Sequence, residues 1–546
     1  MIARLEEIAR EDLLDADLCI VGAGAAGLML AGRFLNTRWN VIVLESGLLG
    51  PDPTGDDLNT LLSVGLRHDG WREGRIRALG GTTRAWGGQL IPLRASEIEE
   101  RSWVPRSGWP IELAELQPFY RRVEELLQIE GPPYDRSAWQ RLGMSAPALD
   151  ADRFCVRFSQ WAALRQRNFA VLWRRALERS GNVSVVLDAT AVAVHCAIGG
   201  DRCESLRVRS RQGLERRIGA RAFVLACGGI EAARLLLASP SPKGNGIANR
   251  SGWLGRCFQD HVSFIAGEVQ PTRRRRIQDL FDPRYLGNTM FSVKIEPTDA
   301  AMREERWLNV MGHIAFEIPD ALGWLELRRM LRSLQAGRLE WPSFDASLAM
   351  ARGSGELLRL VATRYLARRR RSPAKGAVRL LVDSEQAPNP ESRILLDDDR
   401  DAFGMPRARL DWRLGELEHR TLTGFSRAVS AELERLGLGK IALASEPAFD
   451  RRDVLGAARD IFHHMGTTRM SADPQDGVVR PDLQCHDIAN LYVAGPSVFP
   501  TSGIANPTFT ALALSIRLAD HLARALELSA REATVFPERT AHEAQR

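Results

Sequence analysis

Apolar positions near the N-terminus surround a glycine-rich turn in an order typical of a βαβ unit. Asp17–Val21 is an apolar run that predicts a strand, and residues 22–27 follow it as a glycine-rich turn. Leu28–Leu35 then predicts a helix, and Asn40–Leu44 predicts a second strand that leads into Glu45. Strands joined through a helix in this way form parallel sheets of the α/β class.

This turn has the spacing of a dinucleotide-binding fingerprint. Gly22 permits a tight turn, Gly24 lets the backbone approach a pyrophosphate, and Gly27 lets the helix pack closely on the strand. Unpaired N–H groups at the helix start favour phosphates, and Glu45 is placed to accept hydrogen bonds from ribose hydroxyls. A lone GxGxxG also occurs in ordinary packing turns, but the complete unit with its terminal acid predicts a dinucleotide site.

Two later regions bear on which dinucleotide this site would bind. The loop 79–89 holds four glycines around Trp86, which suits contact with a large flat ligand; the alternative is a packing turn with Trp86 as a core plug. Val183–Val194 and Phe223–Ala226 predict strands, and the second is followed by a glycine turn and a helix over Glu231–Ala238.

Near the C-terminus, Leu491–Gly495 predicts a further strand, and a helix with apolar spacing follows over Thr508–Ala525. Pro507 stands at the first helical position and Asn506 before it as N-cap, which is a favoured arrangement. The positive end of this helix would face an anionic ligand at the sheet edge.

Residues 262–452 differ in character from these segments. They contain strands such as Arg393–Leu396 and amphipathic stretches such as Gly323–Leu334 and Gly355–Arg369, without dinucleotide-type turns. We therefore predict an inserted second domain, which residues 101–180 partly join, so that the first domain is discontinuous in sequence.

Composition excludes several classes of protein. Of 546 residues, 45% are hydrophobic and 26% charged, as in soluble globular proteins, and a net charge of +6 does not mark a nucleic-acid binder. The seven cysteines include no CxxC pair, which argues against zinc, iron–sulfur and c-type haem sites. The N-terminus lacks the apolar core of a secretory signal, and the apolar run 18–35 is broken by glycines and an arginine. We expect a cytoplasmic protein without a transmembrane span.

Arginine supplies 70 of the 74 basic residues, because lysine occurs only at positions 243, 294, 375 and 440. The runs Arg273–Arg276 and Arg368–Arg371 predict solvated faces. For the second run, a membrane surface or an acidic partner is the alternative, since the apolar stretch Leu357–Leu366 precedes it.

The densest polar cluster is His463–Met470, with the sequence HHMGTTRM. A histidine with a near-neutral pKa before a small turn can act as a general base, and a structural pair or a metal ligand are the alternatives. No carboxylate or cysteine stands nearby at helical spacing to complete a metal site. Arg469 either pairs with a carboxylate or fixes the turn. The absence of a GxSxG elbow argues against a serine hydrolase.

These motifs occur in one order: the fingerprint with Glu45, the loop GGTTRAWGG, the turn 223–229, GRCFQDH at 255–261, HHMGT at 463–467 and GIANPT at 503–508. Together they resemble the glucose–methanol–choline (GMC) family of FAD-dependent oxidoreductases. The tail VAGPSVFPTSGIANPT, with EQAPNP at 385–390, is most similar to the pyranose oxidase and bacterial sugar dehydrogenase branch. Much of 263–380 stays outside the resemblance.

The resemblance implies an α/β fold with two domains. A discontinuous Rossmann-like FAD-binding domain would comprise residues 1–100, 181–262 and 453–546. An inserted α+β substrate-binding domain on an antiparallel sheet would comprise 101–180 and 263–452.

The resemblance also implies roles for individual residues. His463, the first histidine of HxxGT, would accept the hydroxyl proton while hydride passes to flavin N5, and His464 would only neighbour it. Asn506 would hydrogen-bond the same substrate oxygen. Ala85 stands where some members carry a histidine that binds FAD covalently, so noncovalent FAD is expected, and Gly495 stands where many carry an aspartate.

The implied cofactor contacts lie in the fingerprint, the glycine loops and the C-terminal turn. They are Gly22, Gly24, Ala25, Ala26, Gly27, Glu45, Ser46, Gly80, Gly81, Thr82, Thr83, Trp86, Gly87, Gly88, Val192, Ala226, Cys227, Gly228, Gly495, Asn506, Pro507 and Thr508.

The implied function is FAD-dependent oxidation of an alcohol group of a sugar, glycoside or cyclitol. The alternatives are a nonsugar alcohol, an FAD-containing lyase that uses His463 for proton transfer, and a flavin subunit that docks to an electron carrier through Leu357–Arg371. The electron acceptor could be oxygen, a quinone or an electron-carrier protein. No nucleic-acid partner and no metal are expected. Several tryptophans either stack on a sugar or pack in the core: Trp103, Trp109, Trp161, Trp307, Trp324 and Trp341.

Overall fold

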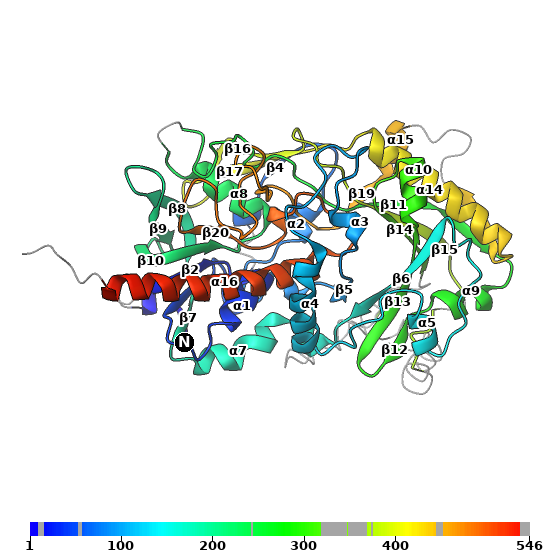
Figure 1. Cartoon of the computed structure of the whole chain (residues 1–546), viewed down its shortest axis with the longest axis horizontal. Coiled ribbons are helices and arrows are strands. Elements are labelled where there is room, and N and C mark those ends of the chain that lie inside the picture. Colours follow the sequence, from blue (N-terminus) through cyan, green and yellow to red (C-terminus); the bar gives the residue numbers. More distant parts are fainter. Residues whose placement is uncertain are drawn as a thin grey trace, which may run out of the picture.

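The computed structural model describes residues 1–8, 16–52, 57–241, 244–317, 345, 347, 368–372, 375–443 and 451–535. Its strands form three sheets. Figure 1 shows the first sheet and helix α16 at one end of the molecule and the second sheet with helix α14 at the other.

The first sheet is mainly parallel, in the order β1-β7-β3-β2-β10-β9-β8, with β20 also paired to β10. Its strands are β1 (Ile2–Arg4), β2 (Ala16–Val21), β3 (Val41–Leu44), β7 (Val183–Leu187), β8 (Thr190–Cys196), β9 (Cys203–Arg209), β10 (Glu215–Leu225) and β20 (Leu491–Val493). All four residues of β3 are buried, as expected for a parallel strand covered on both faces. Helices α1 (Ala25–Gly32) and α16 (Pro507–Val535) pack against each other beside this sheet (Figure 1).

The second sheet has nine strands, which pair antiparallel in the order β18-β11-β15-β14-β13-β6-β5, with β12 beside β13 and β19 beside β11. Its strands are β5 (Gln89–Leu90), β6 (Phe154–Trp161), β11 (Val262–Pro271), β12 (Arg284–Leu286), β13 (Thr289–Pro297), β14 (Val310–Phe316), β15 (Val378–Ser384), β18 (Gly439–Leu443) and β19 (Arg459–Asp460). Helix α14 (Glu416–Arg435) covers one face and buries Leu422, Phe425 and Val429. The predicted combination of a Rossmann-like parallel sheet with a second, antiparallel sheet is therefore confirmed.

The third sheet joins distant parts of the chain. It consists of β4 (Leu62–Gly65), β16 (Arg393–Arg400) and β17 (Pro406–Trp412), with β17 parallel to β4. Helix α8 (Gly229–Ala238) follows β10 and packs against β16 and β17. Residues 393–412, which we assigned to the inserted domain, thus lie beside the first sheet; the domain boundaries stay a prediction.

Shorter helices connect these sheets. They are α2 (Gly70–Glu73), α3 (Ala95–Ile98), α4 (Leu113–Leu127), α5 (Ala138–Arg141), α6 (Leu164–Arg167), α7 (Phe169–Arg179), α9 (Arg274–Phe281), α10 (Asp299–Glu305) and α15 (Arg451–Ala457). Over the described ranges, no helix combines the length and the apolar character that crossing a membrane requires.

The two arginine runs differ in their surroundings. In the first run, the side chains of 273, 275 and 276 are exposed at the start of α9, as predicted. In the second run, Arg369 is only 6% exposed and pairs with Asp279 (2.5 Å) and Asp282 (2.8 Å). The prediction of a solvated face is therefore wrong for Arg369, because acids of the α9 region neutralise it. The stretches Gly323–Leu334 and Leu357–Leu366 lie outside the described residues.

Candidate active site

A cleft lies at the carboxyl ends of β2, β3, β10 and β20. Its lining includes residues at or just after the ends of these strands: Val21, Leu44, Ala226 and Ala494. The N-terminal ends of α1 and α16 reach the same cleft. Ligands of open α/β sheets bind at this edge, so the cleft has the position that the fingerprint predicts.

The turn between β2 and α1 requires glycine at two positions and opens into the cleft at a third. Gly22 has φ +105°, and a Cβ there would lie 2.7 Å from the carbonyl oxygen of Ala226. A Cβ at Gly27 would lie 1.9 Å from the carbonyl oxygen of Gly22. A Cβ at Gly24 would meet no atom within 4 Å. No side chain caps α1 at Gly24, so its first N–H groups can bind an anion. This geometry fits a dinucleotide pyrophosphate.

Glu45 follows β3 and is buried in the cleft wall. Its two carboxylate oxygens accept hydrogen bonds from the backbone N–H groups of Ala23 (3.0 Å) and Gly47 (2.8 Å). Burial raises the pKa of Glu45, while these hydrogen bonds and the charge of Arg77 oppose the shift. Each oxygen has a second lone pair, so the carboxylate can still accept hydrogen bonds from ribose hydroxyls.

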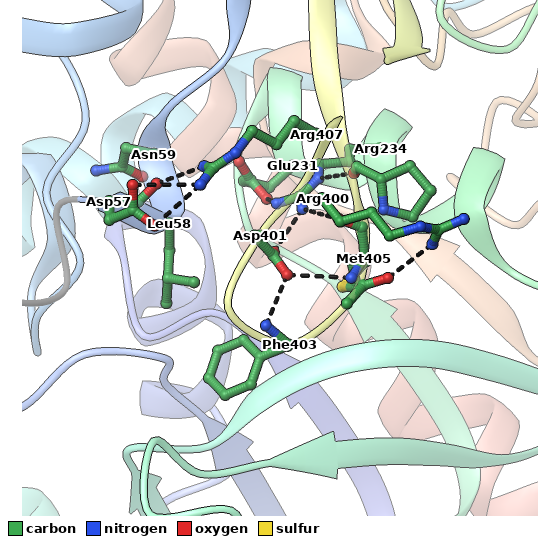
Figure 2. A network of polar contacts seen from close by, with 12 residues as sticks. Asp57, Leu58, Asn59, Glu231, Arg234, Arg400, Asp401, Phe403, Met405 and Arg407 are labelled. Atoms are coloured by element: carbon green, nitrogen blue, oxygen red, sulfur yellow. Dashed lines mark hydrogen bonds and ion pairs between the residues drawn. The ribbon is translucent and has the colours of Figure 1, made fainter. Parts of the chain in front are cut away.

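A network of arginines and carboxylates forms another wall of the cleft. Glu231, in the first turn of α8, pairs with Arg75 (2.7 Å) and Arg77 (3.2 Å). Figure 2 shows Arg234 between Glu231 (3.2 Å) and Asp401 (2.5 Å). Burial opposes ionisation of Glu231, but the three arginines lower its pKa to about 2. Three arginines against two carboxylates leave a positive charge that suits a phosphate. Sequence reasoning missed this wall, because its members come from three separate segments without a common motif.

Most of the predicted cofactor residues line this cleft, together with the predicted base. They are Gly22, Gly24, Ala25, Ala26, Glu45, Ser46, Gly81, Thr82, Ala226, Cys227, Gly228, His463, Gly495, Pro507 and Thr508. The other predicted contacts lie outside its lining: Gly27, Gly80, Thr83, Trp86, Gly87, Gly88, Val192 and Asn506.

The second half of the loop 79–89 packs against neighbouring protein. Trp86 donates from Nε1 to the carbonyl oxygen of Arg167 (2.7 Å), and a Cβ at Gly87 would lie 2.6 Å from the ring of Trp161. These contacts favour the core-plug alternative for Trp86. Val192 is 3% exposed and lies outside the cleft lining, which is formed there by residues 189–191.

His463 lies in the turn after β19, and Asp260 holds this turn. The backbone N–H of His463 donates to Oδ1 of the fully buried Asp260 (2.9 Å). The Nδ1 atoms of His463 and His261 are 2.9 Å apart, so one ring donates its N–H to the other. Burial, followed by the neighbouring His261, lowers the pKa of His463 to about 3. The expected near-neutral pKa is therefore wrong for this structure, and the ring is neutral at physiological pH.

His464 also lines the cleft, but its ring belongs to a different side-chain cluster. Ligand atoms of His68, Asp260 and His464 lie within 4.8 Å of one another, so the fold supplies the carboxylate that sequence spacing did not. His68 Nε2 is 3.1 Å from Oδ2 of Asp260, and His68 Nδ1 accepts from the backbone N–H of Trp71 (3.3 Å). Because both ring nitrogens of His68 and the carboxylate already have partners, we interpret this cluster as structural support for the turn.

Two buried carboxylates hold the loop that leads to Asn506. Glu97 accepts hydrogen bonds from the backbone N–H groups of residues 504 (2.7 Å) and 505 (2.9 Å), and Glu385 accepts one from Gly503 (3.2 Å). The Oδ1 atom of Asn506 is buried without a hydrogen-bond partner. The predicted N-cap role of its side-chain oxygen is therefore wrong, and this oxygen stays available to a ligand.

The remaining polar and aromatic candidates have structural partners. Arg469 donates to the carbonyl oxygen of Arg106 (3.2 Å) and forms no ion pair with a described residue, which favours the alternative that it fixes the turn. Trp109 is 8% exposed and donates to Thr501 Oγ1 (2.9 Å). Trp103 donates to the carbonyl oxygen of Trp307 (2.9 Å) and Trp161 to Ser292 Oγ (3.0 Å). Trp324 and Trp341 lie outside the described residues.

Comparison with known proteins identifies relatives of this chain. Residues 388–515 match the family model described as GMC oxidoreductase. The fructose dehydrogenase large subunit of Gluconobacter japonicus is 22% identical and the match covers 93% of this chain and 98% of that protein. Paromamine 6'-oxidase of Streptomyces fradiae is 24% identical over 94% of this chain and 92% of that protein. Among solved structures, formate oxidase of Aspergillus oryzae RIB40 has the same fold, with a TM-score of 0.56 and 17% identity over 94% of this chain and 98% of that chain.

Proposed function

We propose that the chain is a member of the GMC oxidoreductase family, an FAD-dependent oxidoreductase that acts on alcohols, and that its substrate is a sugar, glycoside or cyclitol. The observation that carries the proposal is the half-buried, neutral His463 in the wall of a cleft that fits a dinucleotide. Relatives whose names give fructose and paromamine as substrates support a substrate of the sugar class.

The residues of the cleft match the parts of the cofactor. The uncapped start of α1 at Gly24 would hold the pyrophosphate, Glu45 a ribose, and the start of α16 at Pro507 an electron-rich ring. When bound, FAD supplies the two-electron acceptor for the alcohol carbon. The protein contributes binding, orientation and proton transfer.

His463 accepts the hydroxyl proton of the substrate at Nε2. The Nδ1 atom faces His261, so the tautomer that donates from Nδ1 to His261 leaves the Nε2 lone pair for the substrate. Asn506 hydrogen-bonds the same substrate oxygen and fixes its orientation toward His463. The carboxylates of Glu97 and Glu385 support this arrangement, because they hold the backbone directly before Asn506.

Denaturation should release all of the flavin, because the loop 79–89 has Ala85 at the position of the family's linking histidine. A methyl group offers no atom for a covalent bond to the flavin. After acid precipitation, the supernatant should contain intact FAD and the pellet should be colourless. As a control, protein that has been stripped of flavin is precipitated with added FAD, which measures how much free FAD the pellet traps. A pellet of the native protein that is more yellow than this control would contradict noncovalent binding.

Anaerobic mixing of the FAD-loaded chain with neutral sugars, glycosides, cyclitols and simple aliphatic alcohols tests the substrate class. We expect a sugar or cyclitol to bleach the visible flavin band at concentrations where aliphatic alcohols leave it unchanged. Bleaching by nonsugar alcohols alone would contradict the sugar class. A bound flavin that no alcohol bleaches would instead favour an FAD-containing lyase.

A further inference from the structure

Three polar side chains lie on the face of the second sheet that α14 leaves uncovered. Lys294 in β13, His313 in β14 and Asp383 in β15 come from neighbouring strands. A Cβ at Gly312 would lie 3.4 Å from the ring of Phe425 in α14. Gly312 therefore faces α14, and the next residue along the strand, His313, faces away from it.

The strand register places the other two side chains on the same face as His313. Asp383 pairs with Met311, which is two residues from His313 and therefore shares its face. Ile295 pairs with the residue before His313 and faces α14, so Lys294 beside it faces away. All three groups thus project from one side of three adjacent strands.

The side chains of Lys294 and His313 have no hydrogen-bond partner among the described residues. Lys294 is only 6% exposed as a whole residue, and within the described ranges its ammonium forms no hydrogen bond and no ion pair, although its nitrogen is not fully buried. The Nδ1 atom of His313 is buried without a hydrogen bond, and its nearest acid is Oδ2 of Asp383 at 3.5 Å. A buried ring nitrogen without a hydrogen bond is unfavourable, and a ligand with hydrogen-bonding groups would satisfy it and would also contact the ammonium of Lys294.

The cluster lies beside His261 and the proposed base His463. Asp383 pairs with Ser263, two residues along the chain from His261, and His261 contacts His463. The carboxylate of Asp383 also acts on the electrostatics of His463. Further along the same face, Ile265 is 46% exposed, so this face opens toward solvent. A ligand across the face can therefore reach the cluster and the base together.

We propose that Lys294, His313 and Asp383 form a subsite that binds the non-reacting hydroxyl groups of a neutral polyol, next to the hydroxyl that His463 deprotonates. This inference rests on the proposed alcohol oxidation. Burial lowers the pKa of Lys294, while the neighbouring acids Asp383 and Glu296 oppose this shift and favour its charged form. His313 is neutral, because burial and Lys294 lower its pKa to about 4. A cluster with donors, an acceptor and no net charge matches hydroxyls better than phosphate or carboxylate. The charge of Lys294 also disfavours an ammonium group, so the substrate class is a neutral sugar or cyclitol rather than an amino sugar.

Lys294→Met and Asp383→Asn test the subsite in the FAD-loaded enzyme. The substrates are the neutral sugar that reduces the wild-type flavin fastest and its amino analogue, for example glucose and glucosamine. Each variant should lose about 10- to 100-fold in kcat/KM for the neutral sugar through KM, because a hydrogen bond to a charged group is lost. The limiting rate of flavin reduction should stay nearly unchanged. Lys294→Met should also reduce the discrimination against the amino analogue.

Arg379→Met is the matched control, because Arg379 lies on the same face of β15, farther from His463, and pairs with Glu317 (2.8 Å). It should leave KM unchanged. Lys294→Met should not lower the unfolding temperature of the holoenzyme, since the lysine has no partner to lose. Unchanged kcat/KM in both variants, or a Lys294→Met effect that appears only as lost stability, would overturn the subsite. A wild type that no sugar reduces would overturn the proposed function itself.

Discussion

The His463→Ala variant should reduce its bound flavin about 10²- to 10⁴-fold more slowly than the wild type, which is the usual contribution of a general base. Asp260 fixes the backbone of His463 and His261 contacts its ring, so the proposed base is held in place before substrate arrives. Alanine removes the proton acceptor without filling its space. Anaerobic stopped-flow measurement of flavin reduction at saturating substrate isolates this step from reoxidation.

The neighbouring histidine provides the matched control. His464→Ala removes a ring that packs 5.4 Å from His68, so it should lower the unfolding temperature more than the rate of flavin reduction. Reduction of the His463→Ala flavin within about tenfold of the wild type, with FAD bound, would exclude His463 as the base.

The pH profile gives a second readout for His463. Burial and His261 lower its pKa to about 3, so the ring stays deprotonated until the pH falls toward that value. Only the neutral ring can accept a proton, and the wild-type rate should therefore not fall between about pH 8 and about pH 5. A loss of rate with a midpoint near the ordinary histidine pKa would contradict this.

Local pattern predicts the elements near the cofactor cleft well, because each depends on adjacent residues. The strand predicted at Asp17–Val21 is observed at Ala16–Val21, and the helix predicted to start at Pro507 starts there. The helix after the fingerprint begins at Ala25 rather than Leu28, since the glycine turn itself supplies its first turn. The run Val183–Val194 is divided into β7 and β8, with Asp188 between them at φ +52°.

Long-range pairing is what the sequence pattern does not contain. Nothing near Leu62–Gly65 indicates that this strand lies parallel to β17, more than three hundred residues away. The same limit applies to the active site, where His463 follows from its motif but its contact with His261 does not. Glu97 and Glu385 carry no motif at all, and only the folded chain brings them to the loop before Asn506.

Replacing Glu385 by alanine should lower the free energy of unfolding by about 3–5 kcal/mol, as expected when one partner of a buried ion pair is removed. Glu385 is fully buried and accepts hydrogen bonds from both terminal nitrogens of Arg101 (2.7 and 2.8 Å) and from Asn309 (2.8 and 3.0 Å). Alanine leaves the Arg101 guanidinium, which is 5% exposed, without a carboxylate. Urea unfolding of the FAD-loaded enzyme, followed by tryptophan fluorescence, measures the change.

An exposed ion pair serves as the control for this variant. Glu178→Ala removes the Arg174–Glu178 pair, whose side chains are 54% and 45% exposed, and should change stability by no more than about 1 kcal/mol. The double variant Arg101→Met/Glu385→Leu should recover much of the lost stability, because two apolar side chains replace the pair. It should not recover the rate of flavin reduction, since the Gly503 N–H still lacks its acceptor and Asn506 loses its support. If Glu385→Ala lowers the free energy of unfolding no more than Glu178→Ala does, the buried pair does not stabilise the loop that carries Asn506.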